Sequence, residues 1–188
     1  MINRDEELLF RILNQKLKEK DQFLDLICVG GFVMNHFAIR ATMDIDSFYT
    51  TNKEIDAIIE EIGKEYELNP DDEIWLNNSV QNMNKKPPVE ICDLLYDFSN
   101  LKVRIPPLEY IACMKLYSAR EQDIKDVSQI IIKKKIELPE DMEKILEKYG
   151  FPEIDESVLL EAFGEAYGME WLEDYYIQKY DLDGHDDR

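Results

Sequence analysis

Two carboxylates in the segment Met43-Asp44-Ile45-Asp46-Ser47-Phe48 have the spacing of a divalent-metal site. Apolar and polar residues alternate in this segment, as on a half-buried strand, so Asp44 and Asp46 share one face. Their Cα atoms would lie roughly 6.6 Å apart, and oxygen ligands at that separation suit one or two hard cations such as Mg²⁺ or Mn²⁺. A solvated strand edge is the alternative, because Asp181-Leu182-Asp183 repeats the same spacing without a strand or glycine turn around it.

A pair of glycines precedes these carboxylates. Residues 26–29 form a short apolar run that predicts a buried strand, and Gly30 and Gly31 stop it where the backbone must turn sharply. Residues 32–39 predict a short helix, whose first amides would lie beside the glycines and attract phosphate. The pattern therefore predicts a phosphate site at Gly30 and Gly31, with a plain turn as the alternative.

These motifs resemble a known signature. VGG followed by RATMDID is similar to the nucleotidyltransferase superfamily with the polymerase-beta-like fold, in which a G-G or G-S turn precedes a D-x-D or D-x-E strand. The R-x-T-x-D-I-D form, WLNNSV and the block P-L-E-x-x-x-x-x-K-L-x-x-x-R-x-x-D-x-x-D resemble a bacterial nucleotidyltransferase-like branch that includes abortive-infection-type toxins. The resemblance covers roughly residues 24–133.

The resemblance implies an α/β nucleotidyltransferase fold, a mixed sheet flanked by helices, with a helical C-terminal extension. It implies NTP as substrate and Mg²⁺ or Mn²⁺ as cofactor, held by Asp44 and Asp46. Arg40 and Thr42, which belong to the R-x-T-x-D-I-D form, would contribute to nucleotide binding. A link to toxin systems would make RNA or a partner protein the acceptor.

A third carboxylate is expected on the next strand. Two-metal phosphoryl transfer commonly uses one to share a metal and take the proton from the attacking hydroxyl. Residues 89–95 read as a strand, and the family places such an acid on a following strand that faces the D-I-D strand. Asp93 and Glu90 are both candidates, and Asp93 is preferred. If neither reaches the metals, the chain keeps a nucleotide-binding site with weak or no catalysis.

A lysine on an apolar helix face is the last candidate. Residues 108–120 have helical spacing, and Lys115 lies on their mainly apolar side, where a cation either extends to solvent or points into a site. The resemblance favours the site, with Lys115 and Asp126 contacting the triphosphate. For Arg120 and Asp123, an ion pair that locks two helices is the alternative.

The remaining elements position these residues. Residues 4–20 and 53–66 predict amphipathic helices that pack on the sheet, and residues 101–105 predict a strand. Residues 73–83 predict a helix in which Trp75 is a core residue rather than a base-stacking platform. After residue 106 the sequence pattern is typical of helices, which predicts an α/β core of residues 1–106 and a helical region of residues 107–188. Within the helical region, helices are predicted at 139–149 and 156–180.

The amino-acid composition and net charge limit the classes of function that fit the chain. The chain has 188 residues and a net charge of −19, which disfavours sequence-independent nucleic-acid binding. The three cysteines, Cys28, Cys92 and Cys113, read as buried thiols of a reducing compartment. No signal segment or membrane-length apolar run is present, so a cytoplasmic protein is expected. The acidic surface suits a basic partner. Near the C-terminus, a stripe of aromatic residues predicts a packing or homodimer surface: Tyr167, Trp171, Tyr175, Tyr176 and Tyr180.

Two functions are consistent with these features. The first is a Mg-dependent nucleotidyltransferase that moves a nucleotide from NTP to a hydroxyl of an RNA or protein acceptor. In this mechanism Asp44, Asp46 and Asp93 hold the metals, and Lys115 neutralises charge on the leaving pyrophosphate. The second is a catalytically weak or inactive regulator, an antitoxin-type protein-binding module that keeps the pocket.

Overall fold

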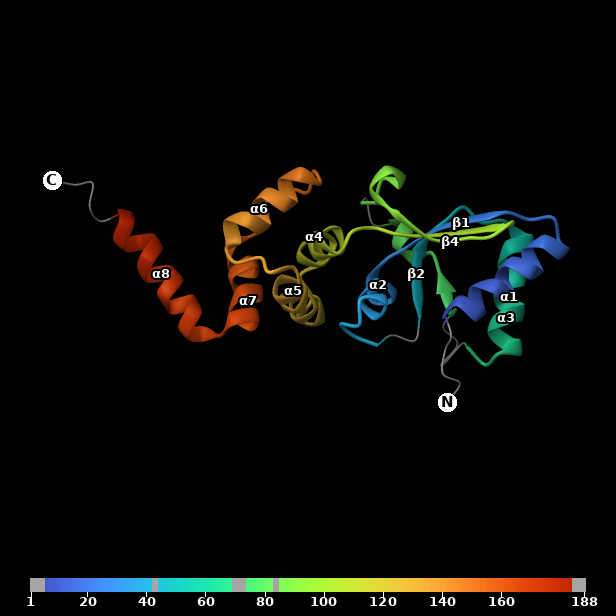
Figure 1. The fold of residues 1–188 in the computed structure, drawn as a ribbon, viewed down its shortest axis with the longest axis horizontal. Helices are drawn as coiled ribbons and strands as arrows, with labels where there is room; N and C mark the ends of the chain where they lie inside the picture. The colour runs from blue at the N-terminus through green and yellow to red at the C-terminus, as the bar shows by residue number, and fades with distance from the viewer. Residues whose placement is uncertain (1–5, 42–43, 69–73, 83–84, 184–188) are drawn as a thin grey trace. The chain divides into compact units, whose positions relative to one another are not determined.

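The computed structural model describes residues 6–41, 44–68, 74–82 and 85–183. The chain divides into two compact units, Met1–Pro107 and Leu108–Arg188. The first unit holds the β-sheet, and the described part of the second is helical (Figure 1). The chain is therefore a mixed α/β protein with a helical C-terminal region.

The first unit is built on a five-stranded mixed sheet. Its strands are β1 (Leu24–Cys28), β2 (Ile45–Phe48), β3 (Leu76–Asn77), β4 (Asp93–Asp97) and β5 (Leu101–Ile105). They lie in the order β3-β2-β1-β5-β4. β1 is parallel to β5 and antiparallel to β2, β2 is parallel to β3, and β4 is antiparallel to β5. The strand expected at residues 101–105 is confirmed.

The described residues of this unit form three α-helices: α1 (Glu6–Glu19), α2 (Gly30–His36) and α3 (Lys53–Glu65). α1 buries Phe10, whose ring lies 5.8 Å from that of Phe32 in α2 and 5.6 Å from that of Tyr96 in β4. α1 and α3 are neighbours in the fold (Figure 1), and Lys16 joins them through an ion pair with Glu61 at 2.7 Å. The amphipathic pattern of both helices therefore marks packing surfaces.

The segment around Trp75 differs from the expected helix. It forms the two-residue strand β3 and the 3-10 helix η2 (Ser79–Asn82). Asn77 is the reason, because its side-chain oxygen accepts hydrogen bonds from the Ser79 backbone N–H and hydroxyl, at 3.2 and 2.7 Å. This local turn competes with helix formation. The core role of Trp75 is confirmed, since its buried indole N–H donates to the Ile59 carbonyl at 2.9 Å.

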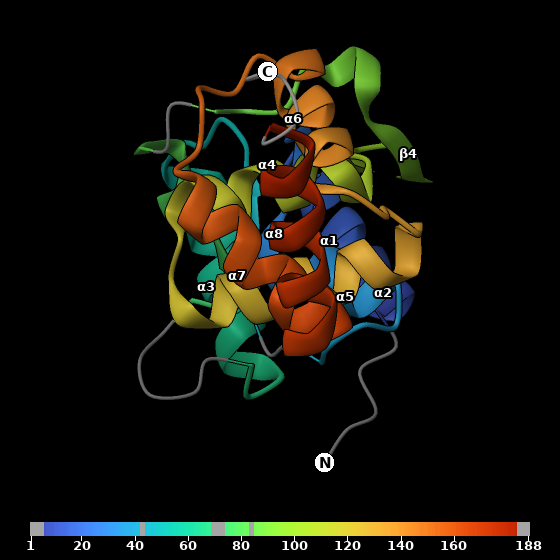
Figure 2. The same ribbon diagram turned by 90° about the vertical axis from the view of Figure 1, so that its left-hand side faces the viewer.

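The second unit contains five described helices: α4 (Leu108–Ser118), α5 (Glu121–Lys134), α6 (Pro139–Lys148), α7 (Glu156–Tyr167) and α8 (Met169–Asp183). α5 packs against both α4 and α7, and α8 packs against α7 (Figure 2). The single helix expected at residues 156–180 is wrong, because Gly168 adopts φ +94° and breaks it into α7 and α8. None of the helices in the described parts of the chain is long and apolar enough to span a bilayer.

Candidate functional site

The glycine turn and the second aspartate of the D-I-D segment meet in the first unit. Gly30 begins α2 with φ +61°, and a β-carbon built on it would lie 3.0 Å from Asp46 Oδ2. The Val29 N–H donates to the Asp46 carbonyl at 2.8 Å, so the backbone fixes this approach. Only glycine combines that dihedral angle with that proximity. A carboxylate therefore lies beside the start of α2, at the position that the sequence predicts for phosphate.

Asp44 and Asp46 are carried by the entry into β2. Asp44 directly precedes the strand, Asp46 is its second residue, and both are half-buried. The intervening Ile45 is buried, as the alternating pattern requires. The predicted strand is therefore present from Ile45 onward, with Asp46 next to the glycine turn, and the shared face of Asp44 and Asp46 stays a prediction because Asp44 precedes the strand.

The strand beside β2 contributes an amide. In the parallel pairing of β2 and β3, Asp46 lies opposite Asn77, and paired residues project from the same face of a sheet. The residue next to Asp46 on the neighbouring strand is thus a neutral amide, whose oxygen already accepts from Ser79. The motif WLNNSV lies in this segment, but the sequence pattern predicts a helix there and therefore does not predict the pairing of β3 with β2. The turn-forming run Asn77-Asn78-Ser79 is the signal that could have revealed it.

Two other predicted nucleotide contacts of this unit are Gly31, the second residue of α2, and Arg40, which lies in the connection between α2 and β2. Gly31 and Arg40 are half-buried, and the Arg40 backbone N–H reaches the Met34 carbonyl at 3.5 Å. Thr42 lies outside the described residues.

The third carboxylate is not where the sequence predicts it. Residues 89–91 form the 3-10 helix η3 (Val89–Ile91) rather than a strand, and β4 is an edge strand with β5 and β1 between it and β2. Three strand spacings separate β4 from β2 by about 14 Å. The expectation that this segment faces the D-I-D strand is therefore wrong.

The register sharpens this correction. Asp93 of β4 lies opposite Ile105 of β5. Arg104 lies opposite Ile27 of β1, so the next residue, Ile105, is in the row of Cys28. Cys28 in turn lies opposite Ser47 of β2. Asp93 is consequently in the row of Ser47, and Ser47 points to the face opposite Asp46. Asp93 and Glu90 are both exposed. Among the described residues no group of three or more Asp, Glu, His or Cys side chains could hold a metal.

Lys115 lies in the second unit, in a buried cluster of charges. Its ammonium is 2.9 Å from Asp123 Oδ1 and 2.6 Å from Asp126 Oδ2, and all three residues are at most 7% exposed. Lys115 belongs to α4 and both aspartates belong to α5, so this cluster joins the two helices. Gln122 Nε2 donates to Asp126 Oδ1 at 3.0 Å and completes it.

Arg120 has a more local role. Its Nε lies 2.7 Å from Asp123 Oδ2, but the two residues are three positions apart at the start of α5. The lock between two helices is thus made by Lys115, and Arg120 supports one of its partners. Burial opposes the ionisation of Asp123, but hydrogen bonds from Lys115 and Arg120 outweigh it and hold the pKa of Asp123 below its ordinary value.

The cysteines do not supply a reactive thiolate. All three are free, and Cys28 and Cys113 are buried. Burial raises the pKa of Cys92 to about 11 and that of Cys113 to about 12. Burial likewise holds the pKa of Cys28 far above its ordinary value. Thiolate chemistry at neutral pH is therefore disfavoured at these positions.

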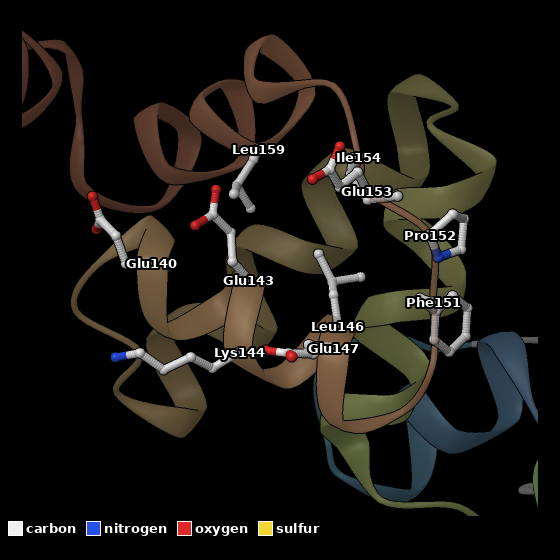
Figure 3. A pocket seen from close by; sticks show the side chains of 10 residues that line it. All are labelled: Glu140, Glu143, Lys144, Leu146, Glu147, Phe151, Pro152, Glu153, Ile154 and Leu159. Carbon is white, nitrogen blue, oxygen red and sulfur yellow. The ribbon is translucent and has the colours of Figure 1, made fainter.

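A hollow of ≈ 570 Å³ lies in the second unit between α6 and the segment that leads to α7 (Figure 3). Leu146, Phe151 and Leu159 form its buried base. Four carboxylates surround it, and the sticks of Figure 3 show Glu143 and Glu153 above Leu146. None of the sequence-predicted site residues lines this hollow, and its acidic rim does not suit a nucleotide phosphate.

Comparison with known proteins places the chain in a family. No curated protein and no solved structure matches it. One family model matches residues 7–175, which include the glycine turn, Asp44, Asp46 and the Lys115 cluster. Because that match covers most of both units, the chain belongs to the family described as "Nucleotidyltransferase of unknown function (DUF6036)".

Proposed function

We propose that the chain transfers a nucleotide from an NTP to a hydroxyl of an RNA or protein acceptor, in a reaction that depends on Mg²⁺. The observation that carries this proposal is the meeting of Gly30 with Asp46. It brings a carboxylate, the start of α2 and a position without a side chain to one point of the first unit.

The donor chemistry fits a hard divalent cation. Asp44 and Asp46 offer carboxylate oxygens, and the missing β-carbon of Gly30 leaves room beside Asp46 Oδ2. Mg²⁺ commonly binds through one or two carboxylates together with substrate phosphates and water, so two aspartates are an adequate protein contribution. When bound, the ion would neutralise charge on the phosphates of the NTP.

The chain's own groups would orient the nucleotide. The first amides of α2 have no acceptor within their helix, and they would donate to the phosphates beside the glycine turn. Asp46 would hold the metal from a position beside this turn. Asn77, in register with Asp46 on β3, would add a neutral hydrogen-bonding group to the same face. Positioning of this kind is the main protein contribution to phosphoryl transfer.

The experiment is incubation of the chain with each α-labelled NTP and Mg²⁺, with total RNA or a co-expressed neighbour protein as acceptor. The labelled nucleotide should appear on one acceptor, and Asp46→Asn should abolish the transfer. Asp93→Asn should leave the transfer unchanged, because β5 and β1 lie between β4 and β2. No transfer from any NTP to either acceptor class would contradict the proposal.

A non-catalytic nucleotide-binding regulator is the second candidate. The observation that favours it is that Asp46 is paired on β3 with the amide residue Asn77, and that among the described residues no third acid joins Asp44 and Asp46 in a metal-holding group. This candidate predicts that an NTP binds with Mg²⁺ and is recovered unchanged. Asp46→Asn would then weaken binding, although no transfer is seen in the wild-type chain.

A further inference from the structure

A groove lies between α7 and α8, two helices of the second unit that pack against each other. Its volume is ≈ 530 Å³. Leu160 and Gly164 of α7 and Leu172 of α8 form its floor, and a β-carbon on Gly164 would touch Leu172 at 3.5 Å. The absence of a side chain at Gly164 lets the two helices approach closely at this point.

Apolar side chains along this groove are exposed. Met169 is 66% exposed, Tyr176 is 38% exposed, and the neighbouring Ile177 is 59% exposed. The aromatic side of α8 is already used for packing, since Trp171 stacks on Phe163 of α7 at 5.5 Å and on Tyr175 at 5.4 Å. The exposed residues thus form a second apolar surface on α8.

The groove is also strongly acidic. Glu161 and Glu165 line it from α7, and Glu173 lies next to Leu172 on α8. Residues 139–176 contain twelve acidic residues against two lysines, so the field around the groove is negative. That field opposes nucleic acid, anionic lipid and a second copy of this chain, whose net charge is −19. It attracts a basic protein segment.

We propose that the groove between α7 and α8 binds a basic amphipathic helix of a partner protein. Apolar residues spaced three and four apart on that helix would contact Met169, Leu172 and Tyr176. Flanking Lys or Arg side chains would pair with Glu161 and Glu165. A groove between two packed helices suits a third helix because side-chain ridges fit such grooves.

The test uses a synthetic amphipathic helix with leucine on one face and lysine on its flanks, titrated against the full-length chain by fluorescence anisotropy. A second peptide carries glutamate in place of lysine. The lysine peptide should bind and the glutamate peptide should not. Met169→Ser with Tyr176→Ser removes exposed side chains and leaves Leu160, Gly164 and Leu172 in place, and should weaken binding by roughly tenfold.

A matched control separates the groove from diffuse attraction. Glu161→Gln with Glu165→Gln should weaken binding of the lysine peptide several-fold. Glu143→Gln with Glu147→Gln, which removes the same charge at the hollow of Figure 3, should leave it unchanged. Equal losses in both pairs, equal binding of the glutamate peptide, or no binding at all would overturn the proposal. A concentration-dependent dimer that Met169→Ser dissociates would also overturn it, because the occupant would be a second copy.

Discussion

Gly30 and Asp46 are joined by a contact that a side chain at position 30 would prevent: a β-carbon there would lie 3.0 Å from Asp46 Oδ2. The two residues are sixteen positions apart in the sequence. Antiparallel pairing of β1 with β2 brings them together, since the Val29 N–H bonds the Asp46 carbonyl. The glycine turn and the D-I-D strand therefore pack together as one local structure.

This contact predicts an unequal response to alanine at two glycines. Gly30 has φ +61° and Gly150 has φ +67°, but nothing lies within 4 Å of a β-carbon on Gly150. Gly150→Ala should cost only the strain of a left-handed residue, about 1–2 kcal/mol. Gly30→Ala should cost more, because it adds the collision with Asp46. Urea unfolding followed by hydrogen exchange, which resolves the two units, would measure both. Equal losses would show that the carboxylate moves aside freely.

Metal binding should depend on the D-I-D carboxylates and not on the edge strand. Asp44→Asn with Asp46→Asn should abolish Mn²⁺ binding, because it removes both carboxylate ligands. Asp93→Asn should leave the Mn²⁺ affinity unchanged, since β5 and β1 lie between β4 and β2. Isothermal titration calorimetry is the measurement. Unchanged affinity in the double variant would return Asp46 to a structural role at the start of α2.

The local parts of the first unit could be predicted from the sequence. The alternation around Ile45, the glycine pair and the apolar run before it each depend on neighbouring residues, and each corresponds to an observed element. The position of Asp93 could not be predicted in this way. Its distance from Asp46 depends on β5 lying between β1 and β4, which is a pairing between distant segments.

The contacts of Lys115 in the second unit could not be predicted from the sequence pattern either. Helical spacing correctly places Asp123 and Asp126 on one side of α5, and Lys115 on a mainly apolar side of α4. It does not show that these two surfaces face each other. If Lys115 extended to solvent or into a site, Lys115→Met would cost little stability. Its burial between two aspartates implies a large cost instead.

Lys115→Met should destabilise the second unit by about 3–5 kcal/mol, because it leaves two buried carboxylates without their shared cation. Lys144→Met is the matched control, since Lys144 pairs with Asp141 at 2.9 Å on an exposed surface, and its effect on unfolding should lie within measurement error. Adding Asp123→Asn and Asp126→Asn to Lys115→Met should recover much of the loss. A Lys115→Met chain as stable as the wild type would contradict the locking role.

The same cluster predicts a loss of stability in acid. The pKa of Asp123 is held below its ordinary value of 3.8 in the folded chain, despite burial, by Lys115 and Arg120. The unfolded chain therefore binds a proton to this carboxyl before the folded chain does. The resulting stabilisation is complete above the unfolded pKa and is lost as the pH falls through the folded pKa.

Asp123→Asn removes this contribution. The free energy of unfolding should be lower in the variant than in the wild type at pH 7, and the difference should shrink as the pH falls below about 4. Urea titrations of both chains between neutral and acidic pH would give the two curves. Subtracting one from the other cancels the many surface carboxylates that both chains share. A difference that stays constant across this range would mean that Asp123 stabilises the unit through its shape and hydrogen bonds, and not through its charge.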